Sequence, residues 1–244
     1  MLSLFKSKPK LAELIPSGYV DIHSHILPGI DDGAQKIKDA EFLFESMIDF
    51  GFSKVITTPH TMKNVWDNTT NSIGDAYNLV HSELPELSKQ VALQYASEYF
   101  LDENLIRLAQ QEKLLTLKDN FILIEMSYLN APIQLYDFLF ELQLKGYQLV
   151  LAHPERYNYF HSNKKEFAKL KKAGCLFQLN LLSTVGYYGK NVADISDYLL
   201  KNDLYDFTGS DIHHQNHIKA FQNKLAFNNG EKITEVMEKN IFFL

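Results

Sequence analysis

The sequence predicts an α/β protein, specifically a distorted seven-stranded (β/α)7 barrel of the TIM-like type. Two observations lead to this fold class: apolar, β-rich runs recur along the whole chain, and a stretch with helical periodicity follows nearly every run. Such alternation is typical of a parallel sheet covered by helices. A chain of 244 residues with 45% hydrophobic content can bury one such core. Because no linker or shift in composition marks a boundary, we expect one domain over residues 19–244 and an N-terminal extension over residues 1–18.

The predicted strands are short segments rich in β-branched and aliphatic residues, at 19–25, 54–60, 91–99, 121–127, 148–154, 175–181 and 205–211. Helices are predicted between them at 34–51, 101–113, 131–146, 163–174 and 191–202. In the first helix, Ile37, Phe44 and Ile48 recur on one face and Gly51 supplies a stop. The segment 61–90 is the longest weakly patterned part, and we expect it to form a loop and a helix beside the mouth of the barrel.

The composition argues against several classes of protein. A formal net charge of -6 and a pI near 5.8 do not fit a broad basic surface, so we expect no nucleic-acid partner. The single cysteine, Cys175, excludes an intramolecular disulfide and fits a reducing compartment. No apolar run reaches the roughly 20 residues that span a bilayer, and residues 1–18 lack the apolar core of a signal peptide. We therefore expect a cytoplasmic protein with no membrane insertion.

Residues that can bind a metal stand at the end of nearly every predicted strand. They are His23, His25, His60, Glu98, Glu125, His153 and Asp211, with His213 just beyond. In a β/α barrel the C-terminal strand ends meet on one face, so residues as far apart as His23 and Asp211 would share one pocket. Imidazole nitrogen together with carboxylate oxygen suits Zn, Mn or Fe. An acid-rich cluster of this size repels itself, which implies more than one cation.

Each of these residues also has a purely structural interpretation. Alternate side chains of a strand share a face about 6.5 Å apart, so His23 and His25 can grip one cation, but an H-x-H pair is also common at strand ends without a metal. Asp211 can be a helix N-cap. Glu98 and Glu125 follow apolar strands, where an unpaired buried carboxylate is costly, and this cost favours a functional role. The joint metal site is favoured because the structural interpretations need several independent coincidences.

The motifs "DIHSHILPGIDDG", "TTPH", "SEYF", "IEMS", "LAHPERY" and "GSDIHH" occur in this order between about residues 19 and 220. In this order and spacing they resemble the polymerase-and-histidinol-phosphatase (PHP) superfamily. More narrowly, they resemble the bacterial manganese-dependent protein-tyrosine phosphatases of the CpsB/YwqE type. The resemblance implies the PHP fold, a distorted seven-stranded barrel with three divalent metal ions at its mouth. Manganese is the expected metal, with iron, zinc or magnesium as alternatives, since the same ligands accept each of them.

Carried over position by position, the resemblance also implies three groups of metal ligands. The first metal is held by His23, His25, Glu98 and Asp211, the second by Glu125 and His153 with Glu98 as a bridge, and the third by Asp32, His60 and His213. Either Asp31 or Asp32 can fill the acidic position of the third group, and the spacing in the family favours Asp32.

Several divalent cations together can activate a water and clamp phosphate oxygens, so the cluster predicts hydrolysis of a phosphomonoester. The thiol-phosphatase signature needs an arginine six positions after its cysteine, but the residue six after Cys175 is Leu181. Arg156 is the candidate catalytic residue, because its guanidinium can bind a phosphate oxygen or assist the leaving group. The resemblance also implies an important arginine at this position. The other arginine, Arg107, is predicted to be an exposed helix residue.

Tyr187, Tyr188 and Lys190 are candidate substrate-binding residues together with Arg156, because aromatic rings and a cation suit phosphotyrosine. The resemblance implies a phosphotyrosine-bearing partner, namely the C-terminal tail of a bacterial tyrosine autokinase that controls capsular or exopolysaccharide synthesis. One alternative is a PHP small-molecule phosphatase such as histidinol-phosphatase. A second, from a different class, is a non-catalytic binding module that uses the metals only for stability. Turnover of phosphotyrosine against histidinol phosphate discriminates among the three.

Overall fold

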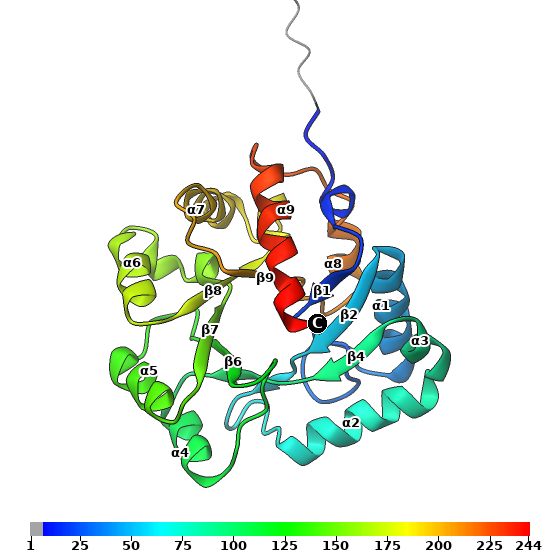
Figure 1. Cartoon of the computed structure of the whole chain (residues 1–244), viewed down its shortest axis with the longest axis horizontal. Coiled ribbons are helices and arrows are strands. Elements are labelled where there is room, and N and C mark those ends of the chain that lie inside the picture. The colour runs from blue at the N-terminus through cyan, green and yellow to red at the C-terminus, as the bar shows by residue number, and fades with distance from the viewer. Residues whose placement is uncertain (1–6) are drawn as a thin grey trace, which may run out of the picture.

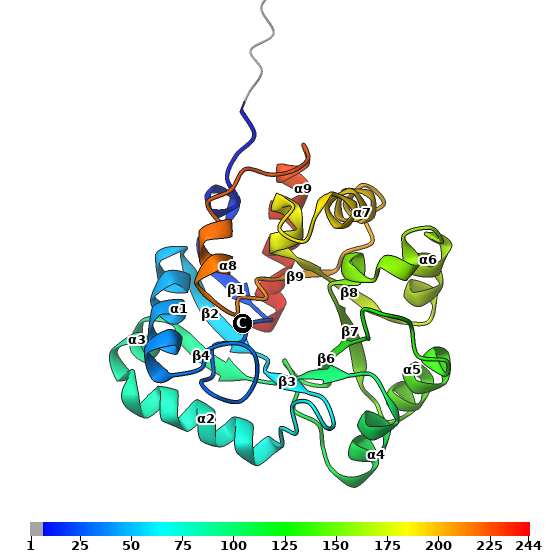
Figure 2. The same cartoon turned by 180° about the vertical axis from the view of Figure 1, so that it is seen from behind.

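The computed structural model describes residues 7–244, in which parallel strands lie around a common centre with helices on the outside (Figures 1 and 2). The strands are β1 (Tyr19–Asp21), β2 (Phe52–Thr57), β3 (His60–Thr61), β4 (Ala92–Tyr95), β5 (Glu98–Phe100), β6 (Phe121–Glu125), β7 (Gln148–Ala152), β8 (Leu176–Asn180) and β9 (Phe207–Gly209). Every pairing between these strands is parallel. The predicted parallel α/β architecture is therefore confirmed.

The predicted count of seven strands in one barrel is not confirmed. The strands form two sheets, with the orders β1-β2-β4 and β3-β5-β6-β7-β8-β9. The difference arises because two predicted strands, 54–60 and 91–99, are each interrupted and become β2 with β3 and β4 with β5. Pro59 lies in the first interruption, and proline has no N–H to donate to a ladder. A parallel bridge between Ser24 and Ile212 links β1 to the end of β9, so the two sheets form an incompletely closed barrel.

The helices follow the strands in the alternation that the sequence predicts. They are α1 (Ile37–Asp49), α2 (Thr70–Glu83), α3 (Pro85–Gln90), α4 (Glu103–Gln111), α5 (Leu135–Leu144), α6 (Lys165–Lys172), α7 (Lys190–Lys201), α8 (Gln215–Ala220) and α9 (Gly230–Glu238). Short 3-10 turns complete the chain: η1 (Leu11–Leu14), η2 (Pro154–Arg156), η3 (Asn158–Phe160), η4 (Leu181–Val185) and η5 (Lys239–Phe243). All five predicted helices are present, four of them within their ranges and α7 starting one residue early. The weakly patterned segment 61–90 forms a loop and two helices.

One end of the barrel is closed by the C-terminal turn η5. Phe243 is fully buried there among inward-facing residues of the strands, such as Val20 and Leu123. The ammonium of Lys54, near the start of β2, donates a hydrogen bond of 2.6 Å to the main-chain oxygen of Phe243. Asn240 donates to the main-chain oxygen of Val20 at 2.8 Å. This plug covers the N-terminal ends of the strands, and the C-terminal ends face the opposite way.

The predicted N-terminal extension is in part structured. Residues 1–6 lie outside the described residues. Leu11 in η1 is fully buried, and its N–H donates to the main-chain oxygen of Asn223 at 3.1 Å. Leu225 N donates in turn to the oxygen of Pro9 at 3.0 Å, so residues 9–14 pack against the segment between α8 and α9. Within residues 7–244, no helix is long and apolar enough to cross a membrane.

Candidate metal centre

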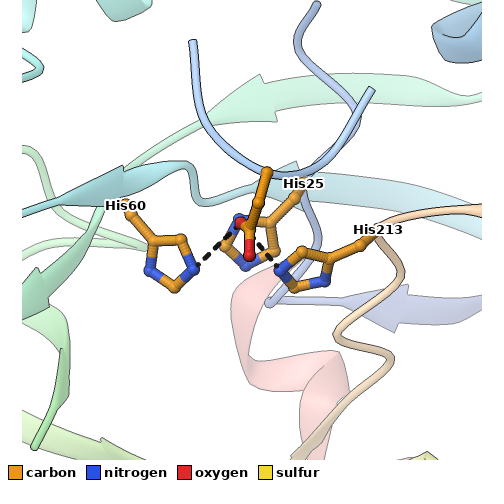
Figure 3. A group of neighbouring side chains, drawn as sticks. His25, His60 and His213 are labelled. Atoms are coloured by element: carbon orange, nitrogen blue, oxygen red, sulfur yellow. Dashed lines mark ion pairs between the residues drawn. The ribbon is translucent and has the colours of Figure 1, made fainter. Parts of the chain in front are cut away.

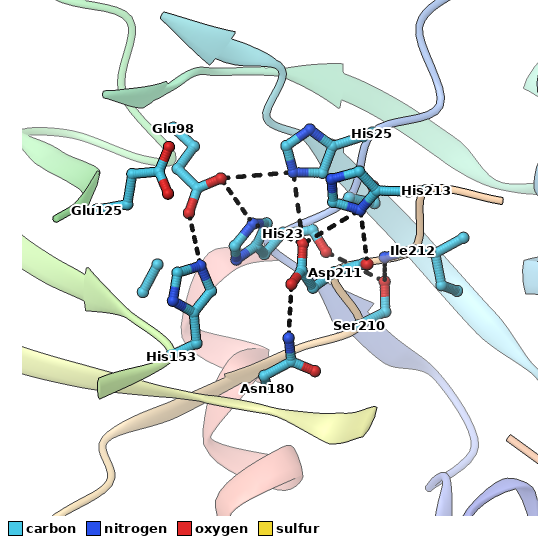
Figure 4. Close-up of polar contacts among 12 residues, drawn as sticks. His23, His25, Glu98, Glu125, His153, Asn180, Ser210, Asp211, Ile212 and His213 are labelled. Carbon is cyan, nitrogen blue, oxygen red and sulfur yellow. Dashed lines mark hydrogen bonds and ion pairs between the residues drawn. The ribbon is translucent and has the colours of Figure 1, made fainter. Parts of the chain in front are cut away.

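The structure brings the nine predicted ligand residues together at the C-terminal end of the barrel; Figure 4 labels most of them, and Figure 3 labels His60. His60 and Glu98 open β3 and β5, Glu125 ends β6, and the remaining ligands lie in the loops that leave β1, β7 and β9, namely His23, His25, Asp32, His153, Asp211 and His213. Most of them are buried, although they are charged or polar. The prediction that strand ends gather these side chains from across the chain is therefore correct in its geometry.

In three of the histidines, one ring nitrogen is hydrogen-bonded to a group outside the nine candidate ligand side chains. This group is a side chain for His23 and His25 and a main-chain oxygen for His213. His23 Nδ1 lies 2.9 Å from the Gln178 side-chain oxygen, and His25 Nδ1 lies 2.8 Å from Asp31. His213 Nδ1 lies 2.9 Å from the main-chain oxygen two residues before it. Each of these contacts accounts for an N–H at Nδ1, so a metal would bind at Nε2 and displace any proton there. The supporting acceptors thus orient the rings.

The free ring nitrogens face two buried carboxylates. His23 Nε2 lies 3.1 Å from Glu98 Oε2 and 3.2 Å from Asp211 Oδ1, and His25 Nε2 lies 3.5 Å from each of the same two atoms. The other oxygen of Glu98, Oε1, lies 3.0 Å from His153 Nε2. Glu98 therefore faces two groups of ligands with its two oxygens, which is the arrangement that a bridging carboxylate needs.

The third group lies nearer the mouth, where the rings of His25, His60 and His213 point toward one another (Figure 3). The Asp32 carboxylate lies 3.5 Å from His60 Nε2 and 3.4 Å from His213 Nε2. Asp31 points elsewhere: it is buried, holds His25 Nδ1, and accepts a hydrogen bond from the N–H of His60 at 3.2 Å. Of the two aspartates that the sequence left open, Asp32 faces the possible metal and Asp31 supports two of the ligands.

The turn that carries both aspartates requires a glycine. Gly33 passes so close to the chain that a Cβ there would lie 2.0 Å from the main-chain oxygen of His25. Only glycine fits such an approach without a shift of the backbone.

Two of the candidate ligands also have left-handed backbones, with φ of 37° at His153 and 51° at Asp211. Non-glycine residues adopt this region rarely, and when they do it is often at functional sites.

The charges of the cluster balance one another internally. Burial alone would raise the pKa of Glu98, but His23 and His60 hold it well below its usual range. The pKa of Asp211 is lowered for the same reason, because the neighbouring histidines, His23 first, and Arg156 together outweigh burial. Burial would lower the pKa of His60, but Glu125 and Glu98 raise it. The carboxylates are therefore anionic, and divalent cations would neutralise them in place of imidazole protons.

Several buried ring nitrogens support the replacement of imidazole protons by metal cations. Among residues 7–244, His25 Nε2, His60 Nδ1 and His153 Nδ1 are buried without a hydrogen-bond partner. His60 Nδ1 lies 2.9 Å from a Glu125 oxygen, yet the two atoms do not meet hydrogen-bond geometry. Since no N–H points from this nitrogen to this oxygen, the short distance is better explained by a cation that both atoms can bind. The nitrogen and oxygen donors fit zinc, manganese or iron.

A cavity of about 570 Å³ opens above the cluster and contains Arg156 in its wall. The guanidinium lies between two aromatic rings, 4.6 Å from the ring centre of Tyr128 and 4.1 Å from that of Tyr188. It also donates a hydrogen bond of 2.8 Å to Asp211 Oδ2. A planar cation held on both faces and at one edge has few conformations left, so its remaining N–H groups are fixed in direction.

Two of the predicted substrate contacts are not found at this cavity. Lys190 begins α7, its side chain is 83% exposed, and its ammonium pairs with Asp194 at 2.5 Å. Tyr187 packs edge-on against His217 and does not line the cavity. Arg156 and Tyr188, the other two predicted contacts, do line it. The sequence placed all of these side chains near the mouth, but the direction of Lys190 depends on where the helix starts.

Three residues at the site were not predicted. Tyr128 stands three positions beyond the end of β6, and Asn180 ends β8 and donates to Asp211 Oδ2 at 2.6 Å. Both occupy strand ends, so the positional rule that found the ligands also applies to them. Trp66 lines the cavity from the loop after β3, where no local pattern indicates its direction. Cys175 is buried before β8, and burial raises the pKa of its thiol to about 12, which excludes it as a nucleophile.

An incompletely closed β/α barrel with imidazoles and carboxylates gathered at its C-terminal end is typical of proteins that bind divalent metals for hydrolysis. The chain belongs to the CpsB/CapC family of capsular polysaccharide synthesis proteins, whose family model matches residues 19–243. This is the CpsB and YwqE type that the sequence motifs indicated.

Similar proteins have been described in several bacteria. The tyrosine-protein phosphatase YwqE of Bacillus subtilis is 30% identical over 195 residues, which cover 80% of this chain and 77% of YwqE. The tyrosine-protein phosphatase CpsB of Streptococcus pneumoniae is 26% identical over 200 residues, covering 80% and 82% of the two chains. The putative tyrosine-protein phosphatase CapC of Staphylococcus aureus is 27% identical over 197 residues, covering 80% and 76%.

The fold is also similar to known structures. One belongs to a set of crystal structures of YwqE from Bacillus subtilis and CpsB from Streptococcus pneumoniae, described as metal-dependent tyrosine phosphatases. It superimposes with a TM-score of 0.77 and 28% identity, covering 90% of this chain and 86% of that chain. An amidohydrolase from Mycoplasma synoviae has a TM-score of 0.52 at 13% identity, covering 99% and 90%. The second likeness shows the barrel type alone.

Proposed function

We propose that this protein is a metal-dependent phosphomonoester hydrolase that removes phosphate from tyrosine residues of a protein. The observation that carries the proposal is the position of Arg156, which lies in one cavity with six of the nine candidate metal ligands. The family, with members named as tyrosine-protein phosphatases, supports the same activity. A capsule or exopolysaccharide tyrosine autokinase, through its C-terminal tail, is the proposed substrate, because the family model is that of capsular polysaccharide synthesis proteins.

Three divalent ions are proposed to be held by the three ligand groups, and manganese is the proposed metal. The first group comprises His23, His25, Glu98 and Asp211, the second Glu98, Glu125 and His153, and the third Asp32, His60 and His213. Close approaches of nitrogen and oxygen atoms support the first and third groups; in the second, Glu98 lies beside His153, whereas Glu125 lies beside His60. Bound ions of this kind supply a water activated near neutral pH and charge that neutralises phosphate oxygens.

The side chains around the cavity would then position the substrate. Arg156 has remaining N–H groups free of the Asp211 contact, and these can bind a phosphate oxygen or the phenolic oxygen that leaves. The walls contain Trp66, Phe100 and Tyr128, whose rings suit stacking against the substrate's phenyl ring. Asp211 holds the guanidinium in place and keeps its charge next to the ligand cluster. The pocket thus combines an anion site at its floor with an aromatic wall, which supports phosphotyrosine over a more polar phosphomonoester.

The proposal is tested by phosphate release from phosphotyrosine peptides, with added manganese, with a chelator, and with manganese restored. We expect activity with the metal, loss with the chelator and recovery on re-addition. Histidinol phosphate, assayed alongside, should have the lower kcat/KM. No metal-dependent release from either substrate would contradict phosphatase activity and support a binding module, whereas a preference for histidinol phosphate would support a small-molecule phosphatase.

A cytoplasmic location belongs to the same proposal. It is supported by Cys175, the single cysteine of the chain, which is buried and cannot form an intramolecular disulfide. Fractionation of cells that make the protein tests the location, and recovery with an oxidised, exported marker would contradict it.

A further inference from the structure

A second cavity of about 310 Å³ lies beside the proposed active site, between the loop that follows β3 and helix α4. Trp66 and Phe100 line both cavities, so the two share a wall. The inner surface of the second cavity is apolar: Tyr99 and Leu105 are nearly fully buried there. An elongated ligand that enters the active site can therefore continue along an apolar surface into this second cavity.

The rim of the second cavity carries a cation without an anionic partner. Arg107 lines the cavity from α4 and donates a hydrogen bond to the side-chain oxygen of Asn104. Within residues 7–244 it forms no ion pair, although 30 aspartates and glutamates make the chain acidic overall. This unpaired cation stands next to the route that a phosphorylated chain would take.

The acidic groups on the same rim are already engaged. Asp102 is the N-cap of α4 and accepts hydrogen bonds from the N–H groups of Asn104 at 2.8 Å and Leu105 at 2.9 Å. Asp67 pairs with Lys63 at 2.9 Å and accepts a hydrogen bond from the N–H of Asn64 at 3.0 Å. Their charge is thus directed at local partners, and Arg107 remains the group on this rim that is available to an anion.

We infer that the second cavity binds the segment of the substrate protein that flanks the phosphotyrosine, and that it selects for an acidic residue there. In this arrangement an apolar or aromatic side chain of the flanking segment packs against Trp66 and Phe100, and a carboxylate pairs with Arg107. The inference rests on the proposed function, because it assigns the phosphotyrosine itself to the cavity of Arg156. It makes Arg107 a specificity-determining residue that does not contact the reacting phosphate.

The test compares the unmutated protein, Arg107→Glu and the matched control Lys113→Glu, each saturated with manganese. Lys113 is exposed, lies shortly after α4, and lines neither cavity, so its reversal makes the same change in net charge. The substrates are a phosphotyrosine peptide with glutamates on both sides, the same peptide with serines in their place, and p-nitrophenyl phosphate. Thermal unfolding of each variant checks that the fold is intact.

We expect Arg107→Glu to lower kcat/KM for the acidic peptide by about tenfold, mainly through KM, which corresponds to the loss of one charge-assisted contact. Its kcat/KM for the serine peptide and for p-nitrophenyl phosphate should stay within about twofold, and Lys113→Glu should leave all three unchanged. Equal effects on the three substrates, or no effect on any, would overturn the inference while leaving the phosphatase activity in place. If the unmutated protein hydrolysed none of them, the proposed function and this inference would fail together.

Discussion

Arg156 donates a hydrogen bond of 2.8 Å to Asp211, and this contact joins the turn after β7 to the loop after β9. Asp211 is a candidate metal ligand through Oδ1, which faces His23 at 3.2 Å, whereas Arg156 uses Oδ2. One carboxylate therefore connects the possible metal centre to the cation beside it. A metal held by Asp211 would therefore lie close to the guanidinium, and both could act on a phosphate that enters the cavity.

The first prediction concerns the charge and shape of Arg156. Arg156→Ala should lower kcat on a phosphotyrosine peptide by about 10²–10³-fold, as the loss of a fixed donor to the transition state does in other enzymes. Arg156→Lys should recover only part of this loss, because an ammonium cannot reproduce the planar fork between Tyr128 and Tyr188. Steady-state kinetics measures both, and metal content is the control. A large loss of bound metal in Arg156→Ala would mean that the arginine supports the metal centre instead.

The second prediction separates the neighbours Asp31 and Asp32. Asp32→Ala should remove one metal ion per chain, because its carboxylate faces His60 and His213. Asp31→Ala should keep the number of ions at saturation but weaken binding by about 10–100-fold, which is the usual effect of losing a residue that orients a ligand. Elemental analysis after desalting and a manganese titration measure the two effects. The reverse pattern would assign the ligand to Asp31.

Asp31 and Asp32 also mark the limit of what the sequence can predict about the site. The strand-end rule located His23, His153 and Asp211, because parallel strands of a β/α fold deliver their C-terminal residues to one face whatever the loops do. Adjacent residues in a turn can each point either way, and only the packing of Asp31 against His25 decides between them. Side chains beyond the strands therefore need the structure.

The same limit explains the other differences between expectation and structure. Lys190 follows two tyrosines in a segment that the sequence places at the mouth of the barrel. However, α7 begins at Lys190, and its ammonium pairs with Asp194. The expected seven strands become nine because Pro59 interrupts a ladder that hydrophobicity alone makes continuous. Hydrophobic patterns indicate which segments are buried, but they do not record where the hydrogen bonds between strands stop.

The third prediction concerns Glu155, which is fully buried beside Arg156 and accepts hydrogen bonds from Asn180, Ser183 and Tyr205. Burial raises the pKa of Glu155 to about 7. An acid with a raised pKa in the folded state stabilises the fold below its unfolded pKa, and this contribution is lost as pH rises through the folded value. Glu155→Gln carries no charge and keeps the oxygen that accepts from Asn180 and Ser183, while its NH2 group replaces the oxygen that faces Tyr205. Relative to the unmutated protein, it should therefore gain stability as pH rises from about 5 to 8, by up to about 3 kcal/mol.

Urea unfolding of both proteins at a fixed manganese concentration measures this difference across the pH range. The difference between the two curves is the quantity of interest, because other titrating groups act on both proteins alike. A difference that stays flat between pH 5 and 8 would show that Glu155 ionises in the folded state near its ordinary pKa.

The last prediction tests whether the two ends of the barrel are independent. Phe243 is fully buried inside the ring of strands, with its ring centre 4.7 Å from that of Phe207, and it lies at the end opposite the candidate metal centre. Phe243→Ala should lower the free energy of unfolding by about 3 kcal/mol, the usual effect of truncating a buried phenylalanine. Its neighbour Phe242 is 40% exposed, so Phe242→Ala should have a clearly smaller effect and serves as the matched control.

Chemical denaturation measures the stability of both variants. Their metal content and their kcat at low temperature should match those of the unmutated protein. Loss of metal from folded Phe243→Ala would mean that the C-terminal plug sets the spacing of the strands as far as His23, since β1 contacts η5 at one end and carries the ligands at the other.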